Sequence, residues 1–282
     1  MARTRPNVVE TVSQLRAAVR AFRGEGAKVA LVPTMGALHA GHVALVRRAR
    51  EIAGRTVVSI FVNPTQFGPT EDFSRYPRTF EADLDKLADV GADLVYAPAP
   101  GEMYPEGFAT RIVVGGPSEG LETDFRPHFF AGVATVVGKL FIHCMPDYAL
   151  FGEKDYQQLK VVTRLSRDLD LGVQVVGMAT VREADGLALS SRNAYLSAAE
   201  RATAPVIHRS LSAAAAAIRA GGDPAAAVAQ AADAIAEAGL KVDYVAARNA
   251  DTLAALAGPG EPVRLLAAAW LGSTRLIDNI PV

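Results

Sequence analysis

The sequence predicts an α/β fold in which a parallel sheet covered by helices is followed by a smaller α+β domain. Two observations lead to this prediction. Apolar runs rich in β-branched residues alternate with amphipathic helical segments through the first part of the chain. The composition then changes to Ala-rich helical segments and short strand-like runs. With 282 residues the chain can hold one large or two ordinary domains. We expect a boundary near Ala184, which gives domains 1–184 and 185–282.

The N-terminal part begins with a strand–helix–strand unit. Lys28–Pro33 and Thr56–Val62 are apolar runs typical of buried strands, and between them His42–Ala53 has the apolar spacing of a helix with one solvated face. Such a unit has a right-handed crossover. The alternation continues with expected helices at Phe80–Val90 and Asp155–Leu169, and expected strands at Asp93–Ala97, Asp147–Phe151 and Val173–Met178.

The C-terminal part has a different pattern. The Ala-rich region from Ala198 to Ala238 predicts helices that are interrupted at Gly221–Pro224, where Asp223 can cap and Pro224 can open the second helix. Three further runs have the character of short strands: Lys241–Ala247, Val263–Trp270 and Arg275–Ile280.

Charge and composition exclude several functional classes. The chain has 29 Lys and Arg against 30 Asp and Glu, so its formal net charge of −1 gives no general reason to bind nucleic acid or an anionic membrane. The single cysteine, Cys144, excludes an intrachain disulfide and a Cys₄ zinc site, and we expect it to be a buried apolar residue. Neither a signal peptide nor a membrane-spanning run is visible, so we expect a cytoplasmic protein.

The most informative segment is Pro33–His42, PTMGALHAGH, between the first apolar run and its helix. A loop at the carboxyl end of a parallel strand is where open α/β sheets bind ligands, and a helix start suits phosphate. His39 and His42 are spaced so that both can face one phosphate, and Gly36 and Gly41 can let the backbone approach a ligand. The alternative is two ordinary surface histidines. P-loop and Gly-x-Gly-x-x-Gly patterns are missing.

The motifs resemble those of a known family. His39-Ala-Gly-His42 is similar to the His-x-Gly-His signature of the nucleotidylyltransferase superfamily, and the wider string resembles the pantothenate synthetase (pantoate–β-alanine ligase) family. Further segments match that family in order along nearly the whole chain: Phe61–Phe67, Tyr76–Thr79, Phe151–Gln158, Asp185–Asn193, Ala268–Gly272 and Arg275–Asn279. The resemblance implies a Rossmann-like parallel sheet with helices on both faces, and a smaller C-terminal α+β domain that closes over the site.

The resemblance also implies a reaction and its partners. The carboxylate of pantoate attacks the α-phosphorus of ATP to give pantoyl adenylate and pyrophosphate. The amine of β-alanine then displaces AMP and gives pantothenate, a precursor of coenzyme A. ATP is the implied co-substrate, Mg²⁺ the implied metal, and a homodimer the implied assembly. Two other classes stay open on the residues alone: a nucleotidylyltransferase that keeps the nucleotide on its product, and a non-catalytic nucleotide sensor.

The implied site residues follow position by position from the matched motifs. The implied catalytic residues are His42, His39, Lys154, Ser190, Ser191 and Arg192. The implied ATP-binding residues are Met35, Gly36, Ala37, Leu38, His39, Ala40, Gly41, His42, Gly152, Glu153, Lys154, Asp155, Val181, Leu189, Ser190, Ser191 and Arg192. Gln66 and Gln158 are the implied pantoate contacts, and Asp83 is the implied metal ligand.

The residue types suit these roles, although each has a plain structural alternative. The ammonium of Lys154 can neutralise phosphate oxygens, while a Lys-Asp pair is also a common surface ion pair. Two hydroxyls and a guanidinium at Ser190–Arg192 suit a leaving pyrophosphate, while the serines can also cap a helix. Two positions depart from the family pattern. Phe129 stands where the family has a histidine, and we leave His128 outside the expected site. Ala82, beside Asp83, stands where relatives often have an acid, so the alternative to an Asp83 ligand is Mg²⁺ held chiefly by phosphates and water.

Overall fold

The structure is a computed structural model that describes residues 4–69 and 71–282. The chain forms two compact units. The first unit holds the chain up to Val114, together with Arg126–Gly152 and Val161–Met178, and the second unit holds Gly115–Phe125, Glu153–Lys160 and Ala179–Val282. This division differs from a single boundary near Ala184, because two short segments from the earlier part of the chain pack with the C-terminal part.

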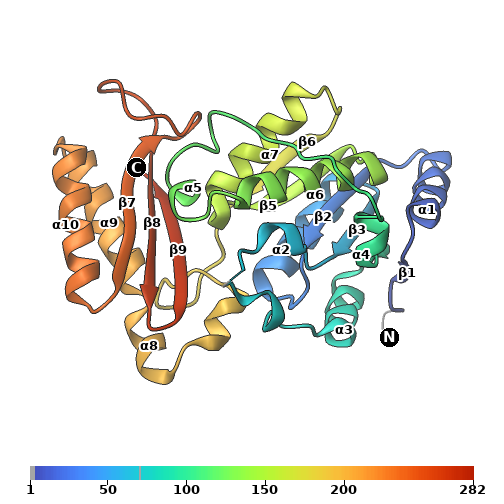
Figure 1. The fold of residues 1–282 in the computed structure, drawn as a ribbon, viewed down its shortest axis with the longest axis horizontal. Helices are drawn as coiled ribbons and strands as arrows, with labels where there is room; N and C mark the ends of the chain where they lie inside the picture. The colour runs from blue at the N-terminus through green and yellow to red at the C-terminus, as the bar shows by residue number, and fades with distance from the viewer. Residues whose placement is uncertain (1–3, 70) are drawn as a thin grey trace. The chain divides into compact units, whose positions relative to one another are not determined.

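The first unit contains a six-stranded parallel sheet (Figure 1). Its strands, in spatial order, are β1 (Asn7–Val9), β4 (Leu94–Tyr96), β3 (Arg55–Ile60), β2 (Val29–Thr34), β5 (Tyr148–Gly152) and β6 (Gln174–Met178). Every pairing is parallel, which confirms the expected α/β sheet. The chain leaves β2 toward β3 on one side and later returns through β5 on the other. The carboxyl ends of β2 and β5 therefore form the switch point at which open sheets bind ligands.

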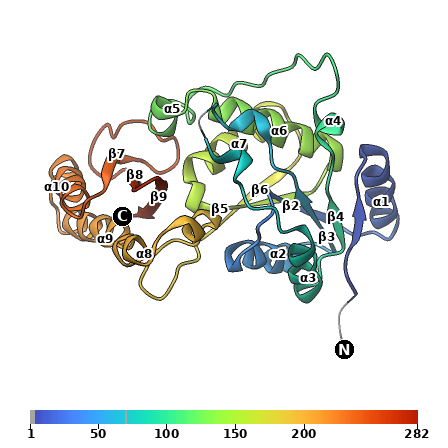
Figure 2. The same ribbon diagram turned by 60° about the horizontal axis from the view of Figure 1, so that its bottom comes forward.

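Helices cover both faces of this sheet, as expected. Figures 1 and 2 show α2 (Ala40–Ile52) and α3 (Phe80–Val90) on one face, and α6 (Phe129–Cys144) and α7 (Tyr156–Asp168) on the other. The remaining helices of this unit are α1 (Val12–Gly24), which contacts α6 and β2, and the short α4 (Pro100–Met103). The apolar side chains of α2 and α3 form one core with the strands, among them Leu45, Val46, Leu84, Leu87, Val32 and Val58.

Helix α6 was not among the expected elements. Nearly all its residues are buried, so it has no polar face and shows no amphipathic period in the sequence. Cys144 lies at its end, buried as expected, and burial raises the pKa of its thiol to about 12. Among the described residues, no helix is both long and apolar enough to cross a bilayer.

The second unit is the expected smaller α+β domain. Its antiparallel sheet has the order β7 (Lys241–Asn249), β8 (Val263–Leu271) and β9 (Thr274–Pro281), and its helices are α5 (Glu122–Phe125), α8 (Ala198–Thr203), α9 (Val206–Arg219) and α10 (Pro224–Glu237). Helices α9 and α10 pack with β8 and β9 in one apolar core. Asp223 caps α10 by accepting from the backbone N–H groups of Ala225 and Ala226, and Pro224 opens it, as the sequence predicted.

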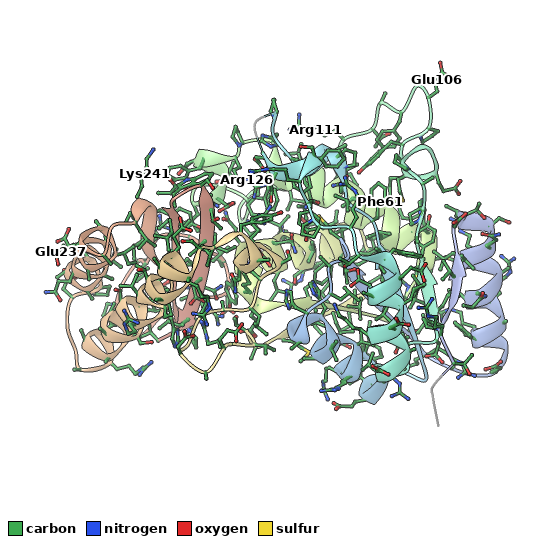
Figure 3. The ribbon with its side chains drawn as sticks, turned by 90° about the horizontal axis from the view of Figure 1, so that it is seen from below. Phe61, Glu106, Arg111, Arg126, Glu237 and Lys241 are labelled. Atoms are coloured by element: carbon green, nitrogen blue, oxygen red, sulfur yellow. The ribbon has the colours of Figure 1, made fainter. Side chains whose placement is uncertain are left out.

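Two charged side chains at element ends are exposed to solvent, whereas an aromatic side chain that follows β3 is buried. Figure 3 labels Glu237 at the end of α10 and Lys241 at the start of β7, and both are exposed. Phe61, which follows β3 in the first unit, is buried, and the centroid of its ring lies 6.2 Å from that of Tyr104. The polypeptide that leaves β3 is thus anchored by an aromatic contact before it reaches the candidate site.

Candidate active site

The two histidines of the PTMGALHAGH segment lie at the start of α2. His39 is the N-cap residue, and its Nδ1 accepts a hydrogen bond from the backbone N–H of Gly41 over 3.2 Å. The Nδ1 of His42 accepts from the backbone N–H of His39 over 3.3 Å, and the two ring centroids are 4.1 Å apart. Because Nδ1 is an acceptor in both rings, the neutral imidazoles carry their proton on Nε2. The structure thus brings together the pair that the spacing predicted.

The glycines of this loop make room for the protein's own side chains. A Cβ atom on Gly41 would lie 2.9 Å from Cε1 of His39, and one on Gly36 would lie 3.2 Å from Cγ2 of Ile60. Gly36 also has a φ of +79°, in the left-handed region that glycine adopts without strain. Both glycines are therefore needed for packing within the protein, and the approach of a ligand to their backbone stays a prediction.

Asp83 holds the same loop from α3. Its side chain is fully buried, and its two carboxylate oxygens accept from the backbone N–H groups of Ala37 and Leu38, each over 2.8 Å. Oδ2 also accepts from Oγ1 of Thr79 over 3.2 Å, and Nζ of Lys86 lies 3.7 Å from Oδ1. This carboxylate does not fit the Mg²⁺ ligand that the resemblance implied. Among residues 4–69 and 71–282, no group of three or more His, Cys, Asp and Glu side chains could hold a metal ion.

The candidate pantoate contact Gln66 lies beside the first residue of the loop. It is buried at the end of the short 3₁₀ helix Pro64–Gln66, and its Nε2 lies 3.2 Å from Sδ of Met35. Its Oε1 accepts from Nδ2 of Asn63 over 3.0 Å, and Oδ1 of Asn63 accepts from the hydroxyl of Tyr104 over 2.7 Å. Sequence reasoning gave Asn63 no role. An amide side chain directly after the apolar run Thr56–Val62 is the sequence signal that could have pointed to it.

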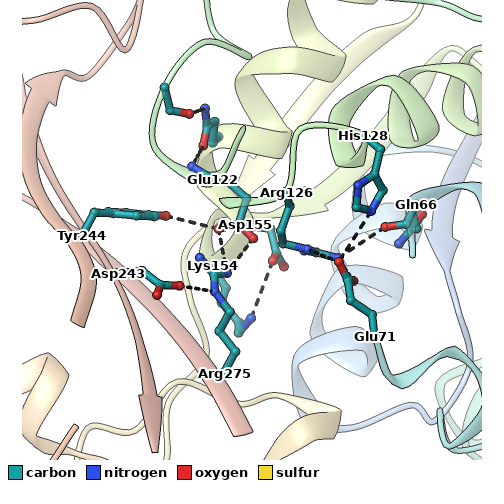
Figure 4. Close-up of polar contacts among 12 residues, drawn as sticks. Gln66, Glu71, Glu122, Arg126, His128, Lys154, Asp155, Asp243, Tyr244 and Arg275 are labelled. Atoms are coloured by element: carbon teal, nitrogen blue, oxygen red, sulfur yellow. Dashed lines mark hydrogen bonds and ion pairs between the residues drawn. The ribbon is translucent and has the colours of Figure 1, made fainter. Parts of the chain in front are cut away.

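Arg126 connects the backbone of Gln66 to the segment that follows it (Figure 4). Its guanidinium donates to the Gln66 carbonyl oxygen over 3.3 Å and, from Nε, to Oε1 of Glu71 over 3.0 Å. Nε2 of His128 lies 3.5 Å from the same Glu71 oxygen. Phe129, at the position where the family has a histidine, stacks its ring 3.9 Å from the guanidinium of Arg126. His128, which we left outside the expected site, is thus connected to the backbone of Gln66 through Glu71 and Arg126.

In the second unit, Lys154 lies on the short 3₁₀ helix Glu153–Asp155. Its Nζ is 3.6 Å from Oδ1 of Asp155, as the simple ion-pair alternative requires. The backbone of this turn is fixed by Asn279 of β9, whose Nδ2 donates to the carbonyl oxygens of Glu153 and Lys154 over 2.8 Å each. Asn279 was part of a matched motif without an assigned role. Its amide holds the backbone of the turn that carries Lys154.

Gln157 and Gln158 differ in burial and lie on different sides of α7. Gln157 is buried, its Oε1 accepts from the backbone N–H of Glu122 over 3.1 Å, and its Nε2 donates to the carbonyl oxygens of Pro117 and Gly120. The amide of Gln157 is thus used to hold the segment Gly115–Phe125. Gln158 is half-buried at the next position of α7, on a different side of the helix.

The Ser190–Arg192 loop follows a short hairpin. The backbone N–H of Leu189 donates to the carbonyl oxygen of Val181 over 3.0 Å, which pairs two of the expected ATP contacts. Oγ of Ser190 accepts from the backbone N–H of Arg192 over 3.3 Å and caps the 3₁₀ helix Ser191–Tyr195. Ser190 therefore has the capping role that we considered as an alternative, and its hydroxyl proton remains available as a donor.

The expected site residues divide between the two units. The first unit brings together Met35–His42, Gln66 and Asp83, and holds Gly152 at the carboxyl end of β5, next to β2. The second unit contains Glu153, Lys154, Asp155, Gln158, Val181, Leu189, Ser190, Ser191 and Arg192.

Comparisons with known proteins agree with these motifs. A family model described as pantoate-beta-alanine ligase matches residues 7–281. A pantothenate synthetase from Nitrobacter hamburgensis is 59% identical over 279 residues, covering 98% of this chain and 99% of the relative. Pantothenate synthetase 2 from Bradyrhizobium diazoefficiens is 60% identical over the same length, with coverage of 98% and 99%.

Solved structures give the same result at the level of the fold. The pantothenate synthetase of Thermus thermophilus superposes with a TM-score of 0.92 at 49% identity, covering 97% of this chain and 98% of that chain. The pantoate-beta-alanine ligase of Francisella tularensis, complexed with Beta-gamma ATP and Beta-alanine, superposes with a TM-score of 0.83 at 31% identity, covering 98% and 97%. Sequence motifs, family model and fold agree, and the chain belongs to the pantoate-beta-alanine ligase family.

Proposed function

We propose that this chain condenses pantoate with β-alanine in two steps. First, a carboxylate oxygen of pantoate attacks the α-phosphorus of ATP, and the bond from that phosphorus to pyrophosphate breaks. Second, the amine of β-alanine attacks the acyl carbon of pantoyl adenylate, the bond to AMP breaks, and the amine loses a proton. The ligands of the Francisella tularensis relative support ATP and β-alanine as substrates of this chain.

The observation that carries this proposal is the arrangement of His39 and His42 at the start of α2. Their Nδ1 atoms accept from backbone N–H groups, so each neutral ring has its proton on Nε2, and in this proposal Nε2 is the atom that donates to a phosphate oxygen. The start of α2 adds the positive end of a helix dipole. Both features stabilise the negative charge that develops on the triphosphate during attack. We assign ATP to Met35–His42, with His42 and His39 on its phosphates.

The second unit supplies the remaining ATP contacts in this proposal. We assign the ammonium of Lys154 to the phosphates, with Gly152, Glu153 and Asp155 beside it. Ser190, Ser191 and Arg192 bind the leaving pyrophosphate through two hydroxyls and a guanidinium. The backbones of Val181 and Leu189 contact adenine. Substitutions in either unit should therefore lower the rate of adenylate formation.

Gln66 and Gln158 bind pantoate in this proposal. A neutral amide donates to a carboxylate and accepts from a hydroxyl, which matches a hydroxy acid. It also leaves the carboxylate more nucleophilic than an ion pair with a guanidinium would. The hydrogen bond from Asn63 and the contact with Met35 support this role, because they hold the Gln66 amide in one orientation.

We propose that Mg²⁺ reaches the protein bound to the phosphates of ATP. Mg²⁺ keeps several water ligands and is commonly held through substrate phosphates, where it neutralises their charge. This agrees with the commitment of the Asp83 carboxylate to backbone N–H groups.

We further propose a homodimer in the cytoplasm, on the basis of the family resemblance, and its mass in solution can be measured by light scattering.

The proposed function is tested by product analysis with the purified chain. ATP turnover is measured with pantoate, with pantoate lacking its 2-hydroxyl group, and with other small hydroxy acids, each with β-alanine or glycine. We expect AMP, pyrophosphate and an amide, with the highest rate for pantoate and β-alanine. A product that retains the nucleotide would identify a nucleotidylyltransferase, and no turnover with any pair would favour a nucleotide sensor.

A further inference from the structure

We propose that Asp83 is a positioning residue that fixes the conformation of the Met35–His42 loop, and that it does not bind the metal ion. This inference rests on the proposed role of that loop in ATP binding. Asp83 lies in the first turn of α3, and its side chain is fully buried. A buried carboxylate is stable only when its charge is compensated by donors or cations. The contacts of Asp83 therefore identify its function.

Two consecutive backbone N–H groups of the loop converge on this carboxylate. The N–H of Ala37 donates to Oδ2 and the N–H of Leu38 donates to Oδ1, each over 2.8 Å. Gly36 and Ala37 have φ angles of +79° and +50°, and such left-handed backbone turns successive N–H groups toward one point, where an anion binds. In this loop the anion is a side chain of the protein itself.

The same helix also holds the carbonyl group of the loop. Lys86, one turn beyond Asp83, donates from Nζ to the carbonyl oxygen of Leu38 over 2.6 Å. Both backbone groups of Leu38 are therefore hydrogen-bonded by α3: its N–H donates to Asp83, and its C=O accepts from Lys86. The next residue, His39, is the N-cap of α2 and carries one of the two proposed phosphate contacts. A fixed Leu38 thus places the start of α2 and both of its histidines.

The donor set around Asp83 leaves at most one lone-pair position on the carboxylate, and the Lys86 ammonium lies beside the oxygen that carries it. Two carboxylate oxygens offer about four lone-pair positions. Ala37 and Thr79 occupy two on Oδ2, Leu38 occupies one on Oδ1, and the Lys86 ammonium lies 3.7 Å from Oδ1. Mg²⁺ requires an octahedral shell and retains several waters, for which a fully buried side chain beside a cation has no room.

The inference has two consequences for how the loop binds ATP. The N–H groups of Ala37 and Leu38 point toward Asp83 and are not donors to phosphate. Within this loop, the contacts to phosphate must instead come from the histidines and the remaining backbone of the α2 start. Loss of the Asp83 charge should therefore weaken ATP binding even when no metal is present, whereas loss of a metal ligand would act only through the metal.

The first test uses the ligand-free protein. In Asp83→Asn the side chain keeps its shape, but one amide N–H group faces a backbone N–H group, so one of the two bonds is lost. We expect amide hydrogen exchange in the peptide 35–39 to quicken about tenfold, the scale of losing a charge-assisted hydrogen bond. Asp85→Asn is the matched control, because Asp85 is an exposed acid of the same helix that pairs with Arg5. Exchange equal to that of Asp85→Asn would overturn the inference.

The second test separates positioning from metal binding. ATP binding is measured by calorimetry in EDTA, and the Mg²⁺ activation constant is measured at saturating ATP. We expect Asp83→Asn to weaken metal-free ATP binding about tenfold and to leave the Mg²⁺ constant unchanged. Unchanged metal-free binding with a raised Mg²⁺ constant would show that Asp83 is a metal ligand. If the wild-type chain does not bind ATP at all, the proposed function fails, while the exchange test still decides the role of Asp83.

A second variant keeps the test decisive if Asp83→Asn does not fold. Lys86→Met retains the apolar stem of a half-exposed side chain and removes the bond to the Leu38 carbonyl together with the positive charge 3.7 Å from Asp83. We expect a smaller change in the same direction, about threefold in exchange of the 35–39 peptide and in metal-free ATP binding. No change in either measurement would show that α3 does not control the loop.

Discussion

Asn63 donates a hydrogen bond from Nδ2 to Oε1 of Gln66 over 3.0 Å, and this bond sets the direction of the Gln66 amide. The Nε2 group of Gln66 consequently faces Sδ of Met35, the first residue of the loop before α2. Asn63 is itself oriented by the hydroxyl of Tyr104, which donates to its Oδ1 over 2.7 Å. Hydrogen bonds that link the side chains of Tyr104, Asn63 and Gln66 therefore determine the orientation of the amide that we propose to contact pantoate.

Tyr104→Phe should weaken this series of hydrogen bonds without altering ATP binding. The substitution removes a half-buried hydrogen bond to Asn63, worth about 1 kcal/mol, and a contact of 3.2 Å with Oγ1 of Thr65. We expect the KM for pantoate to rise about fivefold and the KM for ATP to stay constant. Tyr148→Phe is the control, because its hydroxyl accepts a bond from Lys28 instead. Steady-state kinetics with each substrate varied in turn distinguishes the results. An equal rise in both KM values would contradict a specific effect on Gln66.

His42→Ala should lower the rate of adenylate formation by roughly 10²–10³, the scale of losing one preorganised charge-stabilising group. It also removes the acceptor for the His39 backbone N–H, so we expect a loss of about 1 kcal/mol in the free energy of unfolding with the fold retained. Pyrophosphate release and urea denaturation measure the two effects. A variant that folds and turns over like the wild type would remove His42 from the mechanism.

Arg192→Ala should slow the first step more than the second. A guanidinium that binds pyrophosphate acts on a group that has left before the amide forms. Pyrophosphate formation is compared with the rate of pantothenate formation from supplied pantoyl adenylate and β-alanine. Arg219→Ala, in the last turn of α9, serves as the control. Equal losses in both steps would indicate that Arg192 does not act through pyrophosphate.

His143 should make the protein less stable in mild acid. Burial, with nearby Lys139 and Arg16, lowers the pKa of His143 from 6.5 to about 4, and its Nδ1 lies 3.3 Å from the hydroxyl of Tyr96. Because the unfolded chain takes up this proton first, the contribution of His143 is complete above pH 6.5 and is lost as the pH falls toward 4.

We therefore expect the free energy of unfolding to fall more steeply between pH 7 and pH 4.5 in the wild type than in His143→Gln, by roughly 1–2 kcal/mol. Urea denaturation of both proteins across this range measures the difference, and the other titrating groups cancel in the comparison. Parallel pH profiles would show that His143 is protonated as easily in the folded protein as in the unfolded chain.

Much of the fold could be predicted from periodicity alone. Helix α3 has the bounds Phe80–Val90 that its apolar spacing predicted, and the break before α10 follows from the chemistry of Asp223 and Pro224. Helix α6 could not be found in this way, because a helix that is buried on all sides has no period. The second unit also takes in Gly115–Phe125, which depends on a tertiary contact that no local pattern reveals.

That contact is a buried ionic cluster within the second unit (Figure 4). Arg275 donates from Nη1 to both carboxylate oxygens of Glu122, over 2.6 and 2.8 Å, and from Nε to Asp243 over 2.7 Å. The hydroxyl of Tyr244 lies 3.4 Å from the same Glu122 carboxylate. Glu122 and Arg275 are separated by 153 positions in the sequence, so only the folded chain brings them together.

The candidate site shows the same limit. The pair His39 and His42 was predictable, because both the helix start and the spacing are local features. The role of Asp83 was not, because an acid in the first turn of an amphipathic helix has the same sequence pattern whether it faces solvent, a metal ion or a backbone loop. Only its complete burial and its two bonds of 2.8 Å separate these cases.

In the proposed reaction adenylate formation precedes amide formation, and the site must exclude water because an acyl adenylate is a mixed anhydride that water would hydrolyse. The most direct measurement is pyrophosphate release from ATP and pantoate in the absence of β-alanine. We expect a burst of about one pyrophosphate per active site that then nearly stops, and a restart with AMP release when β-alanine is added. Steady release of AMP without an amine, or no pyrophosphate at all until β-alanine is present, would contradict the two-step account.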